Sequence, residues 1–169
     1  MLQKITPYLW FDTQAEEAVN LYTLIFKNSR ILDMTHYGDV GPGTPGAVMT
    51  VSFELEGQQF VALNGGPEFP FTEAISFLVH CESQEEVDFF WEKLVEGGEE
   101  SQCGWLKDRF GVSWQIVPNA LMELLSDPDP EKAQSVMKAM LQMKKIDIRT
   151  LQEAAYAPPS ASERASSLR

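Results

Sequence analysis

The side chains of this chain that could do chemistry are few and scattered. The 169 residues include two histidines, His36 and His80, and two cysteines, Cys81 and Cys103. Neither histidine has a second one at metal-ligand spacing, and the cysteines form no CxxC motif. A lone histidine on a strand is usually a packing residue, and isolated cysteines in such a chain are reduced, packed thiols. His80 alone, on the same strand parity as Ser76, is kept as a minor site candidate.

Other catalytic motifs are also missing from the sequence. It contains no G-x-S-x-G elbow and no P-loop. Its glycines occur as "GPG", "NGG" and "EGG", and none opens a helix after a parallel strand, as binding of S-adenosylmethionine in a Rossmann-like domain requires. A catalytic triad whose residues lie far apart in the sequence remains an alternative. The acidic residues cluster in helix first turns and in "EGGEE" and "DPDPE", where a solvated surface is expected.

Composition excludes several classes of partner. The formal net charge of -12 repels nucleic acid and anionic lipid, and the pair of lysines at 144–145 is too small a basic patch to reverse this. No apolar run is long enough to span a membrane, and "MLQKITPYLWF" lacks a signal-peptide pattern. We therefore expect a cytoplasmic protein that binds neither nucleic acid nor membrane.

Two segments of the chain repeat one pattern. Residues 12–26 and 82–96 each contain an S/T-x-x-E capping box, Thr13 with Glu16 and Ser83 with Glu86, which predicts a helix start. Each continues as an amphipathic stripe of helical spacing. The stripes consist of Ala18, Leu21, Tyr22, Ile25 and Phe26 in the first segment, and of Val87, Phe90, Trp91, Leu94 and Val95 in the second.

The predicted helices sit in matching strand contexts. Strands are expected at 5–11, 30–38, 47–57 and 59–66, and again at 74–81, 100–108 (with a possible break at Gly104) and 112–118. A tight turn is expected at 108–111. The order β-α-β-β-β occurs twice, with the second copy trimmed, which predicts an α+β fold of two modules, about 3–66 and 74–118.

A helical extension is predicted beyond Pro118. Helices are expected at 119–125, 129–143 and 147–156, and the composition of 157–169 is that of a disordered tail. Four methionines, Met122, Met137, Met140 and Met143, form an apolar stripe that suits core packing or a dimer contact.

Four stretches of the sequence are distinctive: "PYLWFDTQAEEAVNLY", "VALNGGPEF", "GWLKDRFGVSWQIVP" and "VMKAMLQMKKIDIRTLQEAA". They resemble the PhnB-like, or 3-demethylubiquinone-9 3-methyltransferase-like, branch of the vicinal-oxygen-chelate superfamily. That superfamily includes glyoxalases, bleomycin-resistance proteins and dioxygenases. The resemblance implies that the two modules form a curled mixed sheet around a cup. It also implies a homodimer, often with modules contributed across chains.

Metal-using members of that superfamily place His or Glu ligands at four strand positions. Carried over to this chain, these positions fall on Ile5 or Thr6, on Ala62 or Asn64, on Ser76 and on Gln115. None is a His, Asp, Glu or Cys. Neutral amide side chains alone do not offset the free-energy cost of dehydrating a divalent ion. The resemblance therefore implies that this chain holds no metal, and we expect no cofactor.

The remaining prediction is a small-molecule site. Strand alternation turns Gln115 away from Trp114 and Ile116 and toward the cup. We predict a ligand-binding lining made of Tyr8, Asn64, Ser76, Trp105 and Gln115, suited to an uncharged or weakly polar molecule.

The sequence is compatible with four hypotheses about function. They are a metal-independent binding protein, a metal-dependent lyase, isomerase or dioxygenase, a filled cup without function, and an interaction protein that uses the methionine-rich helices.

Overall fold

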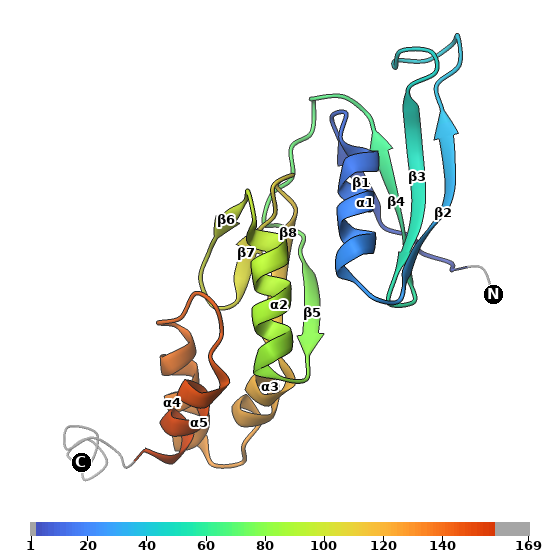
Figure 1. Cartoon of the computed structure of the whole chain (residues 1–169). Coiled ribbons are helices and arrows are strands. Elements are labelled where there is room, and N and C mark those ends of the chain that lie inside the picture. Colours follow the sequence, from blue (N-terminus) through green and yellow to red (C-terminus); the bar gives the residue numbers. More distant parts are fainter. Residues whose placement is uncertain (1–2, 158–169) are drawn as a thin grey trace. The chain divides into compact units, whose positions relative to one another are not determined.

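A computed structural model describes residues 3–157 (Figure 1). Residues 158–169 of the predicted tail therefore lie outside the described residues. The described residues divide into two compact units, one formed by those up to residue 75 with 108–113, and the other by residues 76–107 with those from 114 onward. In the part of the chain that is described, no helix is long and apolar enough to cross a membrane.

The first unit is a four-stranded mixed sheet with one helix. Its elements are β1 (Tyr8–Phe11), α1 (Ala15–Ile25), β2 (Ser29–His36), β3 (Val48–Leu55) and β4 (Gln58–Asn64). The strands are ordered β1-β4-β3-β2, with β1 parallel to β4 and the other pairs antiparallel. Helix α1 lies along one face of this sheet (Figure 1), where Val51, Phe53 and Ala62 are completely buried.

The second unit repeats this plan. It contains β5 (Phe77–Cys81), α2 (Gln84–Val95), β6 (Glu99–Glu100), β7 (Trp105–Lys107) and β8 (Ser113–Pro118), in the order β5-β8-β7-β6. Strand β5 pairs parallel with β8, as β1 does with β4. The predicted duplication of a β-α-β-β-β module, trimmed in its second copy, is thus confirmed. The expected strand at 100–108 is broken before Trp105, because Cys103 and Gly104 both have positive φ angles, of 57° and 84°.

The two helices begin differently despite their similar sequences. Ser83 caps α2 by accepting a hydrogen bond from the N–H of Glu86 at 3.3 Å, and the Glu86 carboxylate accepts one from the N–H of Glu82 at 2.7 Å. The predicted box at Thr13 and Glu16 is wrong, because α1 has Gln14 at its N-cap and no side-chain cap of that kind. Instead Asn64, at the end of β4, accepts a hydrogen bond from the N–H of Ala15 at 2.8 Å. A neighbouring strand thus supplies the acceptor that the local sequence was expected to provide.

The predicted turn at 108–111 is built around a buried carboxylate. Asp108 accepts hydrogen bonds from the N–H groups of Phe110 and Val112 at 2.9 and 3.0 Å, and from the hydroxyl of Tyr22 on α1 at 2.5 Å. Asp108 is 2% exposed and Tyr22 is fully buried. Burial, and then the neighbouring Asp108, raise the pKa of Tyr22 well above its usual value, so the hydroxyl remains a proton donor.

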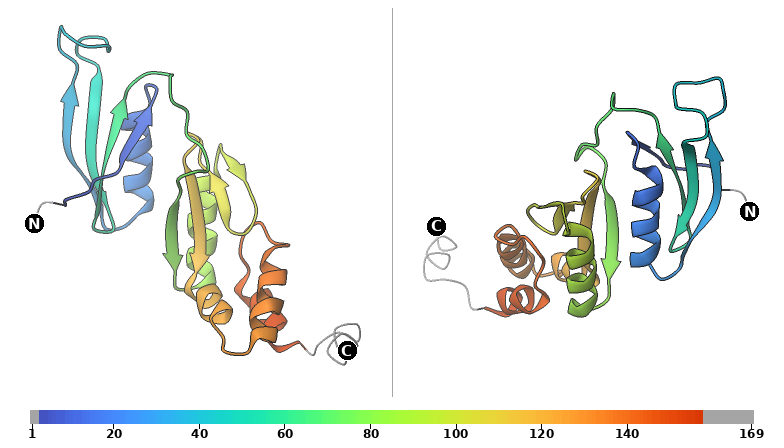
Figure 2. Two further views of the ribbon diagram at one scale, coloured as in Figure 1. Left: turned by 180° about the vertical axis from the view of Figure 1, so that it is seen from behind. Right: turned by 45° about the horizontal axis from the view of Figure 1, so that its top comes forward.

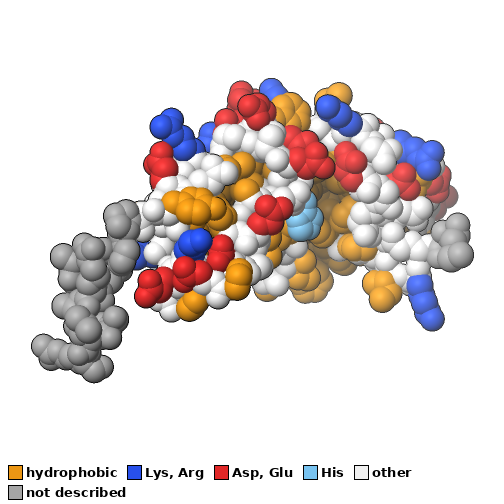
Figure 3. Space-filling model, turned by 90° about the horizontal axis from the view of Figure 1, so that it is seen from below, with side chains coloured by type: hydrophobic (Ala, Val, Ile, Leu, Met, Phe, Trp, Pro, Cys, Tyr) orange, Lys and Arg blue, Asp and Glu red, His pale blue; other side chains and the backbone are white. Residues whose placement is uncertain are grey.

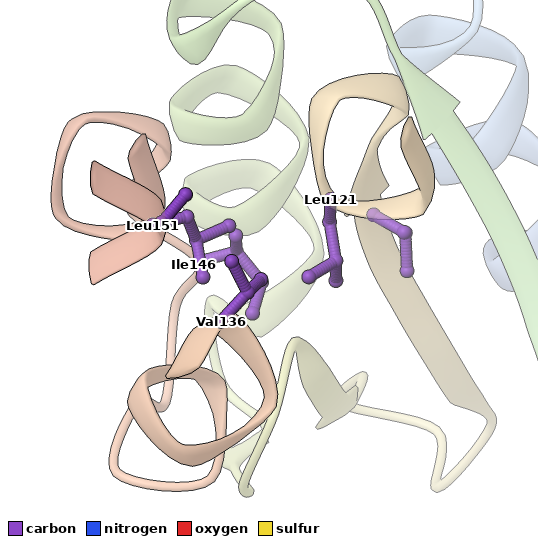
Figure 4. Close-up of a cluster of buried hydrophobic side chains, with 6 residues drawn as sticks. Leu121, Val136, Ile146 and Leu151 are labelled. Carbon is purple, nitrogen blue, oxygen red and sulfur yellow. The ribbon is translucent and has the colours of Figure 1, made fainter. Parts of the chain in front are cut away.

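The C-terminal extension forms a small helical core. Its helices are α3 (Asn119–Leu125), α4 (Pro130–Met140) and α5 (Ile148–Tyr156), close to the predicted bounds. Figure 4 shows the side chains of Val136, Ile146 and Leu151 gathered together, with Leu121 close by. The cluster consists of Val117, Leu121, Val136, Ile146, Leu151 and Ala155.

The methionine stripe divides between this core and the surface. Met140 and Met143 pack against the cluster, whereas Met122 and Met137 are 51% and 42% exposed. Core packing is therefore confirmed for two of the four methionines. A dimer contact through the other two stays a prediction.

The capping difference gives a matched pair of mutations. Ser83→Ala should lower the free energy of unfolding by about 1 kcal/mol, because it removes the side-chain cap of α2. Thr13→Ala, at the equivalent sequence position, should change it by less than about 0.5 kcal/mol. Chemical denaturation of both variants checks this, and equal losses would contradict the assignment of the caps.

Candidate ligand-binding site

The second sheet has one face covered by its own helix and one turned away from it. Trp114 and Ile116 of β8 and Leu106 of β7 lie on the helix side and are almost completely buried. We call the opposite face, turned away from α2, the distal face. In Figure 2 (left) the second sheet is seen from this side, with α2 behind it. Gln115 and its β5 neighbour Leu78 share this face, and Leu78 is 41% exposed.

Hydrogen bonds between β7 and β8 place Trp105 on the same face. The N–H of Asp108 donates to the carbonyl of Val112 at 2.9 Å, and the N–H of Ile116 donates to the carbonyl of Gly104 at 2.8 Å. This antiparallel register sets Trp105 directly opposite Gln115, in a pair without mutual backbone hydrogen bonds, where side chains approach most closely. Trp105, which is half-buried, and Gln115 are therefore cross-strand neighbours on the distal face.

The amide of Gln115 is held by a neighbouring hydroxyl. Gln115 Nε2 donates a hydrogen bond to Ser76 Oγ at 2.9 Å. Among the described residues no donor contacts Gln115 Oε1, so this oxygen can accept a hydrogen bond from a ligand, and the Ser76 hydroxyl can donate one. Three of the five predicted lining residues, Ser76, Trp105 and Gln115, are thus brought together.

Tyr8 and Asn64, the other two predicted lining residues, belong to the first unit and lie on opposite faces of its sheet. Tyr8 is 64% exposed, on the face turned away from α1. Asn64 lies on the α1 side, and its Nδ2 donates to the carbonyl of Val48 at 3.1 Å while its Oδ1 caps α1. The amide of Asn64 is therefore used within the fold.

Two further residues near Gln115 could not be found from motifs. Leu78 adds apolar surface beside Gln115, which only the strand register reveals. Ser113, one pleat before Gln115 on β8, has a buried hydroxyl with no hydrogen-bond partner among the described residues. Buried unpaired hydroxyls are uncommon, and alternation along the strand alone does not predict one. The minor candidate His80 is exposed, on the same strand parity as Leu78.

The donor set does not fit a divalent metal ion. The positions carried over from metal-using proteins are occupied by neutral side chains, of which Ile5 is exposed and Ala62 completely buried. Within residues 3–157 no group of three or more His, Cys, Asp or Glu side chains could hold a metal ion. On the surface in Figure 3, carboxylates, Lys and Arg and apolar side chains are intermixed.

Comparison with known proteins identifies the family of this chain. The family model of 3-demethylubiquinone-9 3-methyltransferase matches residues 3–117, about two thirds of the chain. The chain belongs to this family. No curated protein matches it. The predicted α+β fold class of two β-α-β-β-β modules is confirmed, each module having its own four-stranded mixed sheet.

Several solved structures are similar to this chain. A putative 3-demethylubiquinone-9 3-methyltransferase, the PhnB protein of Bacillus cereus, is 39% identical with a TM-score of 0.64, over 69% of this chain and 99% of that one. A Pseudomonas aeruginosa protein is 22% identical with a TM-score of 0.58, over 69% and 98% of the two chains, and is similar in fold. A glyoxalase/bleomycin-resistance/dioxygenase domain from Frankia is 17% identical with a TM-score of 0.43, over 70% and 93%.

The two cysteines are free and differ in accessibility. Cys81 is buried, and burial together with the nearby Glu86 carboxylate raises the pKa of its thiol to about 12. Cys103 is only half-buried. Because the thiolate is the reactive species, Cys81 should be inert in the folded protein.

Titration with an aromatic disulfide at pH 8 tests this difference. We expect one thiol per folded chain to react quickly and the second only after denaturation, and Cys103→Ser should abolish the fast phase. Two fast thiols, or a fast phase that survives in Cys103→Ser, would show that Cys81 is accessible.

Proposed function

We propose that this chain binds an uncharged or weakly polar small molecule on the distal face of its second sheet, without a metal ion. The observation that carries the proposal is the arrangement of Gln115, hydrogen-bonded to Ser76 and opposite Trp105. An aromatic wall with a few oriented neutral groups is the usual composition of a site for such ligands. A charged ligand would meet no oppositely charged partner among Ser76, Trp105 and Gln115.

The enzymatic alternative is a metal-dependent lyase, isomerase or dioxygenase of the same superfamily. It would need a charged donor set, whereas Ser76 and Gln115 are neutral. Methyl transfer is not part of the proposal, despite the family's name. The loops that lead into α1 and α2, residues 12–14 and 82–83, contain no glycine, whereas an S-adenosylmethionine site of the Rossmann type needs a close backbone approach there.

The proposal extends to assembly and location. We propose a cytoplasmic homodimer, on the basis of the acidic composition and the resemblance to family members. The apolar surface that Met122 and Met137 expose is compatible with a contact between copies.

Binding of Nile red, an uncharged fluorescent probe, tests the proposed site. Trp105→Ala should weaken its binding about tenfold, equivalent to about 1.4 kcal/mol, because the aromatic wall is lost. Gln115→Ala should weaken it less. Phe89→Ala, which removes an exposed ring from α2, should change the affinity less than twofold.

Metal dependence is tested on the same protein. Melting temperatures with and without Zn²⁺, Ni²⁺, Mn²⁺ or Fe²⁺ should agree, and chelator treatment should leave Nile red binding unchanged. A stoichiometric metal that is lost in Gln115→Ala would sink the proposal in favour of the metal-dependent enzyme.

A further inference from the structure

The C-terminal extension holds the two residues that lead into Trp105. The N–H of Cys103 donates to the carbonyl of Met143 at 2.8 Å, and the N–H of Gly104 donates to the carbonyl of Lys144 at 2.7 Å. These backbone groups are therefore satisfied by a segment some forty residues later in the chain, and not by a neighbouring strand of the sheet.

Gly104 is enclosed between β8 and the extension. A Cβ atom at this position would lie 2.8 Å from the carbonyl oxygen of Ile116 and 3.2 Å from Cγ1 of Ile146. With φ at +84°, Gly104 also adopts a conformation that side chains disfavour. Ile146 is fully buried and thus forms a wall directly behind the start of β7.

The segment Met143–Ile148, which we call the brace, is itself clasped to α2. Gln84 Nε2 donates to the carbonyl of Ile146 at 3.1 Å, and Gln84 Oε1 accepts from the N–H of Ile148 at 2.8 Å. Lys145 Nζ lies 2.6 Å from Asp88 Oδ1, one turn further along α2. Hydrogen bonds from Lys145 and Gln84 lower the pKa of the Asp88 carboxyl.

The brace lies beyond the last residue that the family model matches. The family model ends at Val117, before α3 begins, and the Bacillus cereus protein is matched over 99% of its length by 69% of this chain. The contacts that fix the entry to Trp105 thus come from a segment that follows the two β-α-β-β-β modules.

We propose that the brace positions Trp105 and so determines the shape of the binding site on the distal face. The effect on ligands rests on the proposed function, whereas the positioning of Trp105 does not. Gln84, Lys145 and Ile146 act as positioning residues, since they reach Trp105 through the backbone of Cys103 and Gly104.

Fluorine NMR of the full chain labelled with 5-fluorotryptophan tests the positioning. The chain has four tryptophans, and single Trp→Phe variants assign their resonances. Gln84→Ala removes both clasp hydrogen bonds without altering the distal face, so the Trp105 resonance should shift or broaden. The Trp10 resonance, from the first unit, should stay unchanged and report that the chain is folded. Gln152→Ala, an exposed glutamine on α5, is the matched control and should move neither resonance.

Ile146→Ala provides a second perturbation, from the side-chain wall behind Gly104. The Trp105 resonance should respond in this variant as well. An unchanged Trp105 resonance in Gln84→Ala, in a chain with the normal Trp10 signal, would overturn the proposal even if Ile146→Ala failed to fold.

Nile red binding then separates the two proposals. Gln84→Ala should weaken it threefold to tenfold, with Gln152→Ala unchanged. A shifted Trp105 resonance with unaltered affinity would refute the effect of the brace on the site. If the unmodified protein bound no Nile red, the proposed function would fail, while a shifted Trp105 resonance would still support positioning by the brace.

Discussion

One helix can cover only one face of a four-stranded sheet, and each unit of this protein has one helix packed on its sheet. In β3 this constraint separates a buried set of side chains from a less buried one. In β3, Val51 and Phe53 are completely buried against α1, whereas Thr50 and Ser52 on the other side are only partly so. In the second unit the same division turns Leu106 toward α2 and Trp105 away from it. The candidate site lies on this second face of the sheet in the second unit.

The chemistry of the candidate site follows from the absence of charge on Ser76, Trp105 and Gln115. Gln115 and Ser76 satisfy one another through one hydrogen bond and keep one acceptor and one donor for a ligand. A carboxylate in place of Gln115 would attract a cation, but it would also need a compensating charge when buried by a ligand. A neutral pair avoids this desolvation penalty and suits a neutral guest. The same neutrality makes these residues poor ligands for a divalent ion.

The sequence predicted the local features of the fold well. The repeated β-α-β-β-β order, the three helices of the extension and the turn at Asp108 depend on patterns within short segments, and all three are present. The helix start at Thr13 was mispredicted because its capping acceptor comes from Asn64, a contact that is remote in sequence.

The site was predictable only in part, for the same reason. Alternation along β8 correctly assigned Gln115 to the face opposite Trp114. The position of Trp105 opposite Gln115 depends on the register of β7 against β8, and the brace that holds Cys103 and Gly104 at the entry to β7 lies far along the chain. Long-range hydrogen bonds of this kind leave no periodic signal in the sequence.

The most direct measurement of the central claim is crystallographic. The protein should be purified from its native host without a chelator and crystallised. Anomalous diffraction data should then be collected at metal absorption edges. We expect organic density against Trp105 within hydrogen-bonding reach of Gln115 and Ser76, with no anomalous peak. An anomalous peak coordinated by side chains of that face would contradict it.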